Sequence, residues 1–269
     1  MNEEKVIKNS DFPVTKNRLI EDLNFGGLKA GDTIIVHSSL SSLGWVCGGP
    51  VTLIQALIDI VTEKGDIVMP AHSEDYTEPS YWRNPPVDES WWDIIREEMP
   101  AYQQEITPCR GIGIVPETFR KFPNVKRSSH PAVSFTAWGK NSNYITSEHS
   151  LEYSLGENSP LGKIYNLKGK VLLIGVNHDR NTSLHLAEHK ANFQKEKEIQ
   201  GAPIIQDGKR IWIEYEDLKY NDSDFIDAGE AFEKKINYQE FNIGHTTARI
   251  IPQKPLVNFA AKWFSKNRK

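Results

Sequence analysis

Short apolar runs and a stretch with helical periodicity alternate near the start of the chain. Residues 33–37 (TIIVH) and 66–70 (DIVMP) are apolar runs that predict two strands. Between them, residues 50–64 carry apolar side chains at helical spacing, with Pro50 at the first helical position and Gly65 just past the end. This order predicts two parallel strands joined by a right-handed crossover. Binding loops then lie beyond the carboxyl ends of the strands.

The pattern is interrupted once and then resumes. Residues 71–109 contain five prolines and three tryptophans and predict a long ordered excursion with a short helix at 90–98. A β-hairpin is predicted over 202–215, where Asp207 and Gly208 supply a two-residue turn. The other predicted elements are helices at 116–121, from Ser159, from one of residues 181–183, at 223–235 and at 254–266, and strands at 132–138, at 170–176 and between the last two helices.

The length and the even composition indicate how these elements are organised. The chain has 269 residues, and no repeat, linker or shift in composition divides it. We therefore expect a single α/β domain over residues 1–269, with a mixed, largely parallel sheet flanked by helices and a β-hairpin. Residues 71–109 are expected to form an inserted wall of a substrate pocket.

The charge and the cysteine content exclude several classes of protein. Lys and Arg number 32 against 36 Asp and Glu, a formal net charge of −4, so a nucleic-acid partner is not indicated. The N-terminus is charged, and the longest apolar stretch, 53–61, includes Gln55 and Asp59, which predicts neither a signal peptide nor a membrane partner. We expect a cytoplasmic protein whose two cysteines are reduced.

A loop rich in serine and glycine joins the first strand to the first periodic helix. Its residues, 38–50, read SSLSSLGWVCGGP, and small side chains leave backbone N–H groups open beside a helix N-terminus. The spacing fits neither common nucleotide-binding motif. The loop is either an anion-binding segment or an ordinary strand-to-helix turn.

A second candidate is the segment His185-Leu186-Ala187-Glu188-His189. In a helix, His185, Glu188 and His189 share one face. Two imidazoles so placed can hold zinc with the glutamate as base, since HxxEH is the inverted zinc-peptidase motif. Alternatively, one neutral imidazole is a general base and a carboxylate fixes its tautomer. A surface helix that carries these residues by chance is the third interpretation.

Other polar residues are weaker candidates when taken singly. His37, His72 and the remaining histidines are expected to be structural. Arg127 could bind a phosphate. Cys47 could carry an acyl group. Carboxylates that flank aromatic or histidine-bearing loops could attract a polycation, namely Glu74, Asp75, Glu78, Asp179 and Glu188.

Five segments in one order carry a resemblance to a known family. They span residues 36–50, 67–92, 110–139, 156–164 and 172–189. The chain resembles the aminoglycoside 3-N-acetyltransferases, also called antibiotic N-acetyltransferases, along nearly its whole length. The resemblance implies acetyl transfer from acetyl-CoA to the 3-amino group of a 2-deoxystreptamine aminoglycoside, through a ternary complex, without a covalent acyl-enzyme and without the GNAT fold.

The resemblance also implies roles for particular residues. His185 corresponds to the catalytic base and Glu216 to an acid that supports it, although Glu214 and Asp217 lie close enough for the alignment to slip. No metal is implied. Residues expected to bind acetyl-CoA are Ser38, Ser39, Leu40, Val46, Cys47, Gly48, Gly49, Arg127 and Ser128. Residues expected to bind the cationic acceptor are Asp75, Trp82, Asp179 and Glu188.

Three alternatives to this function stay open on the sequence. The same scaffold could acetylate an amine that is not an antibiotic. An HxxEH zinc hydrolase and a non-catalytic module that binds CoA or an acyl carrier are the others. A homodimer is one assembly that the sequence leaves open.

Overall fold

Three parallel strands form the centre of the sheet in the computed structural model, which describes residues 3–268. Strand β1 (Thr33–Ser38) lies between β2 (Asp66–Pro70) and β5 (Lys170–Ile174) and is parallel to both. The sheet is covered on both faces, so these strands are continuous apolar runs rather than alternating ones. The strand–helix–strand prediction at the start of the chain is confirmed.

Antiparallel strands extend the sheet on both sides. Strand β4 (Phe135–Gly139) pairs with β2, and β3 (Lys126–Arg127) pairs with β4. On the other side, β9 (Thr246–Pro252) pairs with β5, and β8 (Phe241–Ile243) pairs with β9. The strand order is β3-β4-β2-β1-β5-β9-β8. This confirms a mixed α/β sheet, with its parallel pairs at the centre.

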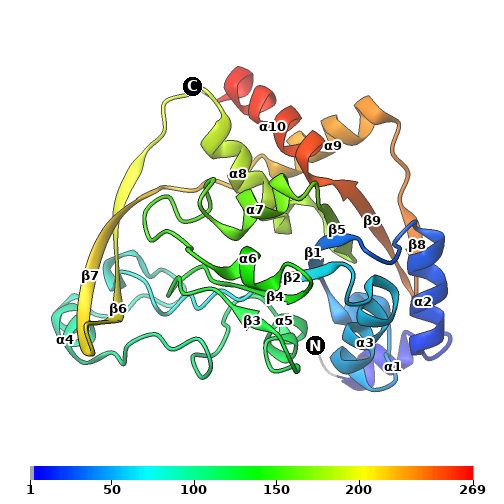
Figure 1. Ribbon diagram of the computed structural model, residues 1–269, viewed down its shortest axis with the longest axis horizontal. Coiled ribbons are helices and arrows are strands. Elements are labelled where there is room, and N and C mark those ends of the chain that lie inside the picture. The colour runs from blue at the N-terminus through cyan, green and yellow to red at the C-terminus, as the bar shows by residue number, and fades with distance from the viewer. Residues whose placement is uncertain (1–2, 269) are drawn as a thin grey trace.

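Helices cover the two faces of the sheet (Figure 1). Side chains of α2 (Lys16–Phe25), α3 (Gly49–Val61) and α5 (Ile114–Phe119) pack on one face together with Ile34 and Val36 of β1. The intervening residue Ile35 packs in the cluster on the opposite face, because successive strand side chains alternate. The helices of that face are α7 (Pro160–Asn166), α8 (Ser183–Lys190), α9 (Phe225–Ile236) and α10 (Gln253–Asn267).

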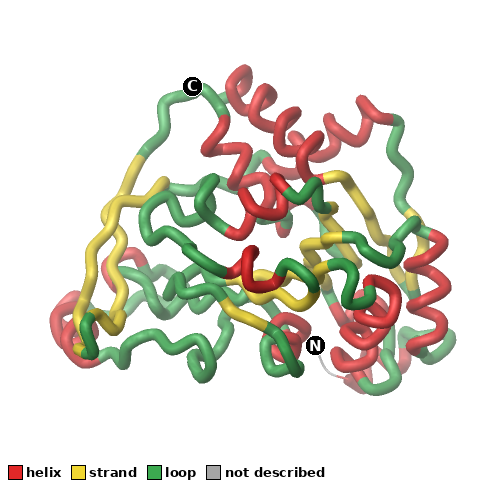
Figure 2. Tube along the Cα trace, viewed as in Figure 1, coloured by secondary structure: helices red, strands yellow, loops and turns green. Residues whose placement is uncertain are grey.

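The segment at 71–109 lies beside a separate two-stranded sheet (Figures 1 and 2). The strands of this small sheet are β6 (Lys197–Gln206) and β7 (Lys209–Leu218). They are joined at Asp207 and Gly208, which both have positive φ. The predicted hairpin is therefore confirmed. The segment itself contains α4 (Trp92–Glu98), and the Tyr102 N–H donates to the Pro203 carbonyl of β6 at 2.9 Å.

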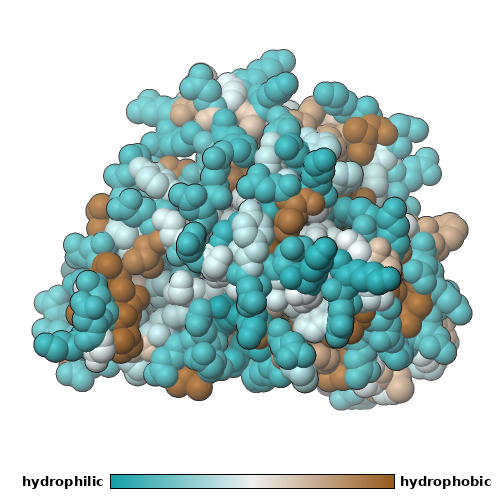
Figure 3. Space-filling view, in the orientation of Figure 1, coloured by the Kyte–Doolittle hydropathy of each residue, from teal (hydrophilic) through white to brown (hydrophobic). Residues whose placement is uncertain are grey.

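Four elements were not predicted from the sequence. They are α1 (Glu3–Lys8), α2, α6 (Ser142–Thr146) and the two-residue β3. The single strand predicted between the last two helices is instead the pair β8 and β9. Every helix within residues 3–268 is too short or too polar to cross a bilayer. Polar side chains cover most of the face in Figure 3, with an apolar patch over the hairpin.

Asp66 ties the start of β2 to its neighbours. Its carboxylate is fully buried and accepts hydrogen bonds from Asn141 N (2.5 Å), Asn141 Nδ2 (2.8 Å) and Thr33 Oγ1 (2.7 Å). Asp66→Ala leaves these buried donors unpaired and is expected to lower the free energy of unfolding by about 2–3 kcal/mol in urea denaturation. The control Asp59→Ala, which breaks an exposed pair with Lys16, is expected to cost less than about 1 kcal/mol. Equal losses would contradict this role.

Candidate active site

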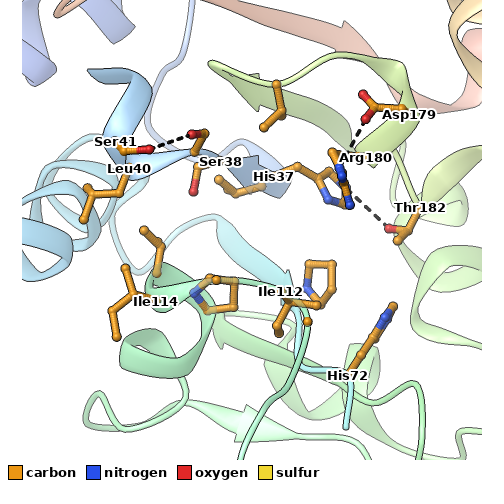
Figure 4. Close-up of a pocket in the computed structure, with 18 of the residues that line it drawn as sticks. His37, Ser38, Leu40, Ser41, His72, Ile112, Ile114, Asp179, Arg180 and Thr182 are labelled. Atoms are coloured by element: carbon orange, nitrogen blue, oxygen red, sulfur yellow. Dashed lines mark hydrogen bonds and ion pairs between the residues drawn. The ribbon is translucent and has the colours of Figure 1, made fainter. Parts of the chain in front are cut away.

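A cavity of about 1130 Å³ opens where the three parallel strands end. Its walls come from the loop after β1, from residues just after β2, from residues 176–182 after β5 and from the N-terminal end of α5 (Figure 4). Parallel strands point their carboxyl ends to one edge, so these loops converge there. The volume exceeds the roughly 300–1,000 Å³ of most small-molecule pockets, and two ligands could lie side by side.

The loop after β1, residues 38–49, forms one wall and is called the serine–glycine loop. Gly44, Gly48 and Gly49 have φ of 87°, 84° and 59°, a region that glycine enters without steric cost. Gly48 is the N-cap of α3 and has no side chain to cap the helix. The Gly49 N–H donates to the Val46 carbonyl and Pro50 has no N–H, so the first-turn donor left for an anion is the Val51 N–H. Ser38, Ser39, Leu40, Val46, Gly48 and Gly49 line the cavity.

His185 lies on the first turns of α8 and faces the same cavity. Its Nδ1 is 2.6 Å from Oε2 of Glu188, one turn further along the helix. The imidazole packs against the rings of Tyr220 and Phe225, at 4.9 and 4.8 Å between centroids. Since Nδ1 is engaged by Glu188, Nε2 is the nitrogen left for a ligand.

Glu188 is held from three sides. The residue is 3% exposed, and its Oε1 accepts from Arg268 Nη1 (2.5 Å) and from the Asn221 N–H (3.1 Å). Both carboxylate oxygens therefore have partners, and Glu188 does not line the cavity. Glu188 was expected to bind the cationic acceptor, and the structure instead places its charge against His185 and Arg268.

Two further histidines line the cavity. His37, near the end of β1, has Nε2 3.3 Å from Thr182 Oγ1, and His72 follows β2 (Figure 4). Burial, with a smaller contribution from the charge of His185, lowers the pKa of each to about 3. Both imidazoles are therefore neutral at physiological pH. Sequence analysis treated the two histidines singly, and the parallel pairing of β1 with β2 brings both to one edge of the sheet.

Carboxylates reach the cavity from several loops. Asp179, which was expected here, lines it and forms an ion pair with Arg180 at 3.2 Å. Glu74 and Asp222 also line it. Burial raises the pKa of Glu74. These three acids could receive a cationic ligand.

Glu216 is not beside His185. It lies on β7 of the hairpin, where its Oε1 accepts from Tyr153 and from Lys197 Nζ, the latter at 2.8 Å. Neighbouring Asp217 bonds Ser154 and Tyr220 instead. The expected support of His185 by Glu216 is corrected: the contacting carboxylate is Glu188, three residues away in the same helix.

Arg127 and Ser128 are buried behind the cavity rather than in it. The Arg127 guanidinium donates to the carbonyls of Thr107 (2.5 Å) and Ala71 (2.7 Å) and to Ser134 Oγ (3.0 Å). Ser128 Oγ pairs with a histidine and with a backbone N–H. Both residues were expected to bind CoA, and the structure instead engages their polar groups inside the protein.

The remaining predicted residues lie outside the cavity lining. Asp75 pairs with Arg110 Nη1 at 2.8 Å, and Trp82 Nε1 donates to Thr77 Oγ1 at 2.9 Å. Cys47 is exposed, and its N–H donates to the Val14 carbonyl. Of the segment 71–109, the cavity is lined by His72 and Glu74, whereas its tryptophans contribute nothing to the lining.

The HxxEH segment does not gather zinc ligands. His189 Nε2 is 2.9 Å from the Tyr220 hydroxyl, and Glu188 is engaged by His185 and Arg268. Within residues 3–268, no three His, Cys, Asp or Glu side chains are arranged to hold a metal ion.

Comparison with known proteins identifies the family. Residues 35–265 match the family described as aminoglycoside 3-N-acetyltransferase. The chain belongs to this family and is an acyltransferase of it. Aminoglycoside N(3)-acetyltransferase VII of Streptomyces paromomycinus is 35% identical over 84% of this chain and 78% of its own.

Closer similarity is found to a protein of Bacillus subtilis. The SPbeta prophage-derived aminoglycoside N(3')-acetyltransferase-like protein YokD is 50% identical over 98% of this chain and 97% of its own. Its crystal structure superposes with a TM-score of 0.96, at 49% identity and 98% coverage of both chains. The acetyltransferase AAC-IIIb, solved as a binary complex with CoASH, has a TM-score of 0.85 at 28% identity and covers 95% of this chain and 97% of its own.

The burial of Arg127 predicts a structural role. Arg127→Met leaves several buried carbonyls unpaired and is expected to lower the free energy of unfolding by about 3 kcal/mol in urea denaturation. Calorimetric CoA affinity of the folded variant is expected to change less than threefold. Arg83→Met, on the exposed surface of the segment at 71–109, is the control and should leave stability nearly unchanged. Loss of CoA affinity at unchanged stability would restore the binding role.

Proposed function

We propose that the protein transfers acetyl from acetyl-CoA to the 3-amino group of the 2-deoxystreptamine ring of aminoglycosides, directly within a ternary complex and with His185 as general base. The observation that carries the proposal is the His185–Glu188 pair, which lies in one cavity with the serine–glycine loop. The family to which the chain belongs supports the substrate class.

The general-base role follows from how His185 is held. Its Nδ1–H donates to Glu188, which leaves the Nε2 lone pair to take a proton from the substrate ammonium. The freed amine attacks the thioester carbonyl, the C–S bond breaks, and CoA leaves as a thiolate that takes the proton from the His185 imidazolium. The new amide nitrogen releases its remaining extra proton to solvent. The Glu188 carboxylate fixes the tautomer of His185 and stabilises its imidazolium, as the buried acid does in a Ser-His-Asp triad.

The serine–glycine loop is suited to acetyl-CoA. The N-terminus of α3, which follows this loop, favours phosphate and can donate to the oxyanion that develops on the thioester. Cys47 has its side chain outside the cavity lining. This arrangement supports direct transfer, because the loop's thiol is not aimed at the reacting centre.

The carboxylates that line the cavity favour a cationic acceptor. Glu74, Asp179 and Asp222 bring negative charge to a cavity in which His37 and His72 are neutral. A polyamine sugar is therefore attracted without repulsion from those imidazoles. Holding it beside the thioester would supply much of the rate advantage.

Removal of the base tests the proposal. His185→Gln is expected to lower kcat at least 100-fold in a thiol-release assay with acetyl-CoA and a panel of aminoglycosides and simple amines, with CoA affinity within threefold. His189→Gln is the matched control, since His189 lies one turn along α8 and outside the cavity lining. Retained turnover by His185→Gln would reject the base. Wild-type turnover of simple amines alone would reject the aminoglycoside as acceptor.

The two candidate partners of His185 can be separated in the same assay. Glu188→Gln keeps the volume but removes the charge beside Nδ1 and is expected to lower kcat at least tenfold. Glu216→Gln acts on an exposed pair with Lys197 and is expected to change kcat less than twofold. The opposite order would return the supporting role to Glu216.

A further inference from the structure

One buried polar atom of the cavity wall has no partner in the protein. Nε2 of His72 is shielded from solvent, yet no hydrogen-bonding atom of residues 3–268 is within reach. His72 lines the cavity that contains His185. Burying an unpaired polar nitrogen costs free energy, so such an atom in a binding cavity calls for a ligand that satisfies it.

The position of His72 is set by its surroundings rather than by a hydrogen bond to its ring. The imidazole stands edge-on to Phe135, with 5.4 Å between centroids and 82° between planes. Its backbone carbonyl accepts from the Arg110 N–H at 2.8 Å. The neighbouring charges of His185 and Arg127 and its burial favour the neutral form, in which one ring nitrogen can accept a hydrogen bond.

His72 lies at the end of the cavity away from the serine–glycine loop, where the proposed function places the acceptor. Figure 4 shows it at the same end as Thr182 and Arg180, away from Leu40 and Ser41 of the serine–glycine loop. Glu74, two residues further along the chain, adds a carboxylate to the same wall. The hydrogen bond that Nε2 can accept therefore comes from the amino sugar rather than from the nucleotide part of CoA.

We propose, on the basis of the function proposed above, that His72 is an acceptor-binding residue whose Nε2 accepts a hydrogen bond from an N–H or O–H group of the amino sugar beside the amine that His185 deprotonates. The carboxylates attract any polycation through charge. His72 adds a directional contact that an acceptor without a donor at that point cannot make, and such contacts discriminate strongly between substrates.

The test compares His72→Leu with His72→Gln. Leu removes the hydrogen bond, whereas the Gln side chain keeps an acceptor, so a purely structural role and a ligand contact respond differently. With sisomicin as acceptor, His72→Leu is expected to raise KM for sisomicin at least tenfold. His72→Gln is expected to stay within about threefold of wild type. KM for acetyl-CoA and CoA affinity are expected to stay within twofold in both, and His189→Gln serves as the histidine control.

The outcomes separate this proposal from the proposed function. If the wild type acetylates sisomicin and His72→Leu leaves KM for sisomicin unchanged, the role of His72 is overturned and the proposed function stands. A loss of CoA affinity in His72→Leu also overturns the role of His72. If the wild type does not acetylate sisomicin, the proposed function fails, and calorimetric titration with sisomicin then tests the role of His72. A tenfold weaker affinity for sisomicin in His72→Leu, with wild-type affinity in His72→Gln, supports that role. Equal affinities, or no binding to wild type, overturn it.

Discussion

The parallel pairing of β1 with both β2 and β5 is the constraint from which the cavity follows. Because the three strands run the same way, each ends at the same edge of the sheet, and their following segments must meet there. Ser38, His72 and the start of α8 are far apart in the chain and become neighbours only through this pairing. Reversal of any one strand would send its loop to the opposite edge.

Buried ion pairs hold the site residues in place at that edge of the sheet. Arg268, at the end of the described chain, pairs with Glu188 and Asp224 and packs over the Phe264 ring at 4.0 Å. Glu188 in turn holds His185. Charges withdrawn from water are tolerated when paired and hydrogen-bonded, and breaking such a pair is costly. The C-terminal helix thus takes part in orienting the imidazole that faces the cavity.

Prediction succeeded where local chemistry decided the outcome. The strands β1, β2 and β5, the helix α3 and the hairpin at Asp207-Gly208 have apolar patterns or turn residues that few alternatives share. It failed for β3, a two-residue strand with no periodicity of its own. It also gave no sign of the buried contacts of Arg127, since the carbonyls that bind its guanidinium come from other segments of the chain.

The sequence by itself determined the family, the parallel centre of the sheet, the serine–glycine loop and the position of His185 and Glu188 on one helical face, because spacing along a chain determines neighbours within a helix, a strand or a turn. The tertiary structure alone decided which carboxylate touches the imidazole, which polar residues are buried and which of them line the cavity. Glu188 and Glu216 are both acids that the sequence offers as partners for a histidine, and the position of the hairpin keeps Glu216 away from His185. Burial and distance between remote segments are properties of packing, and no local pattern encodes them.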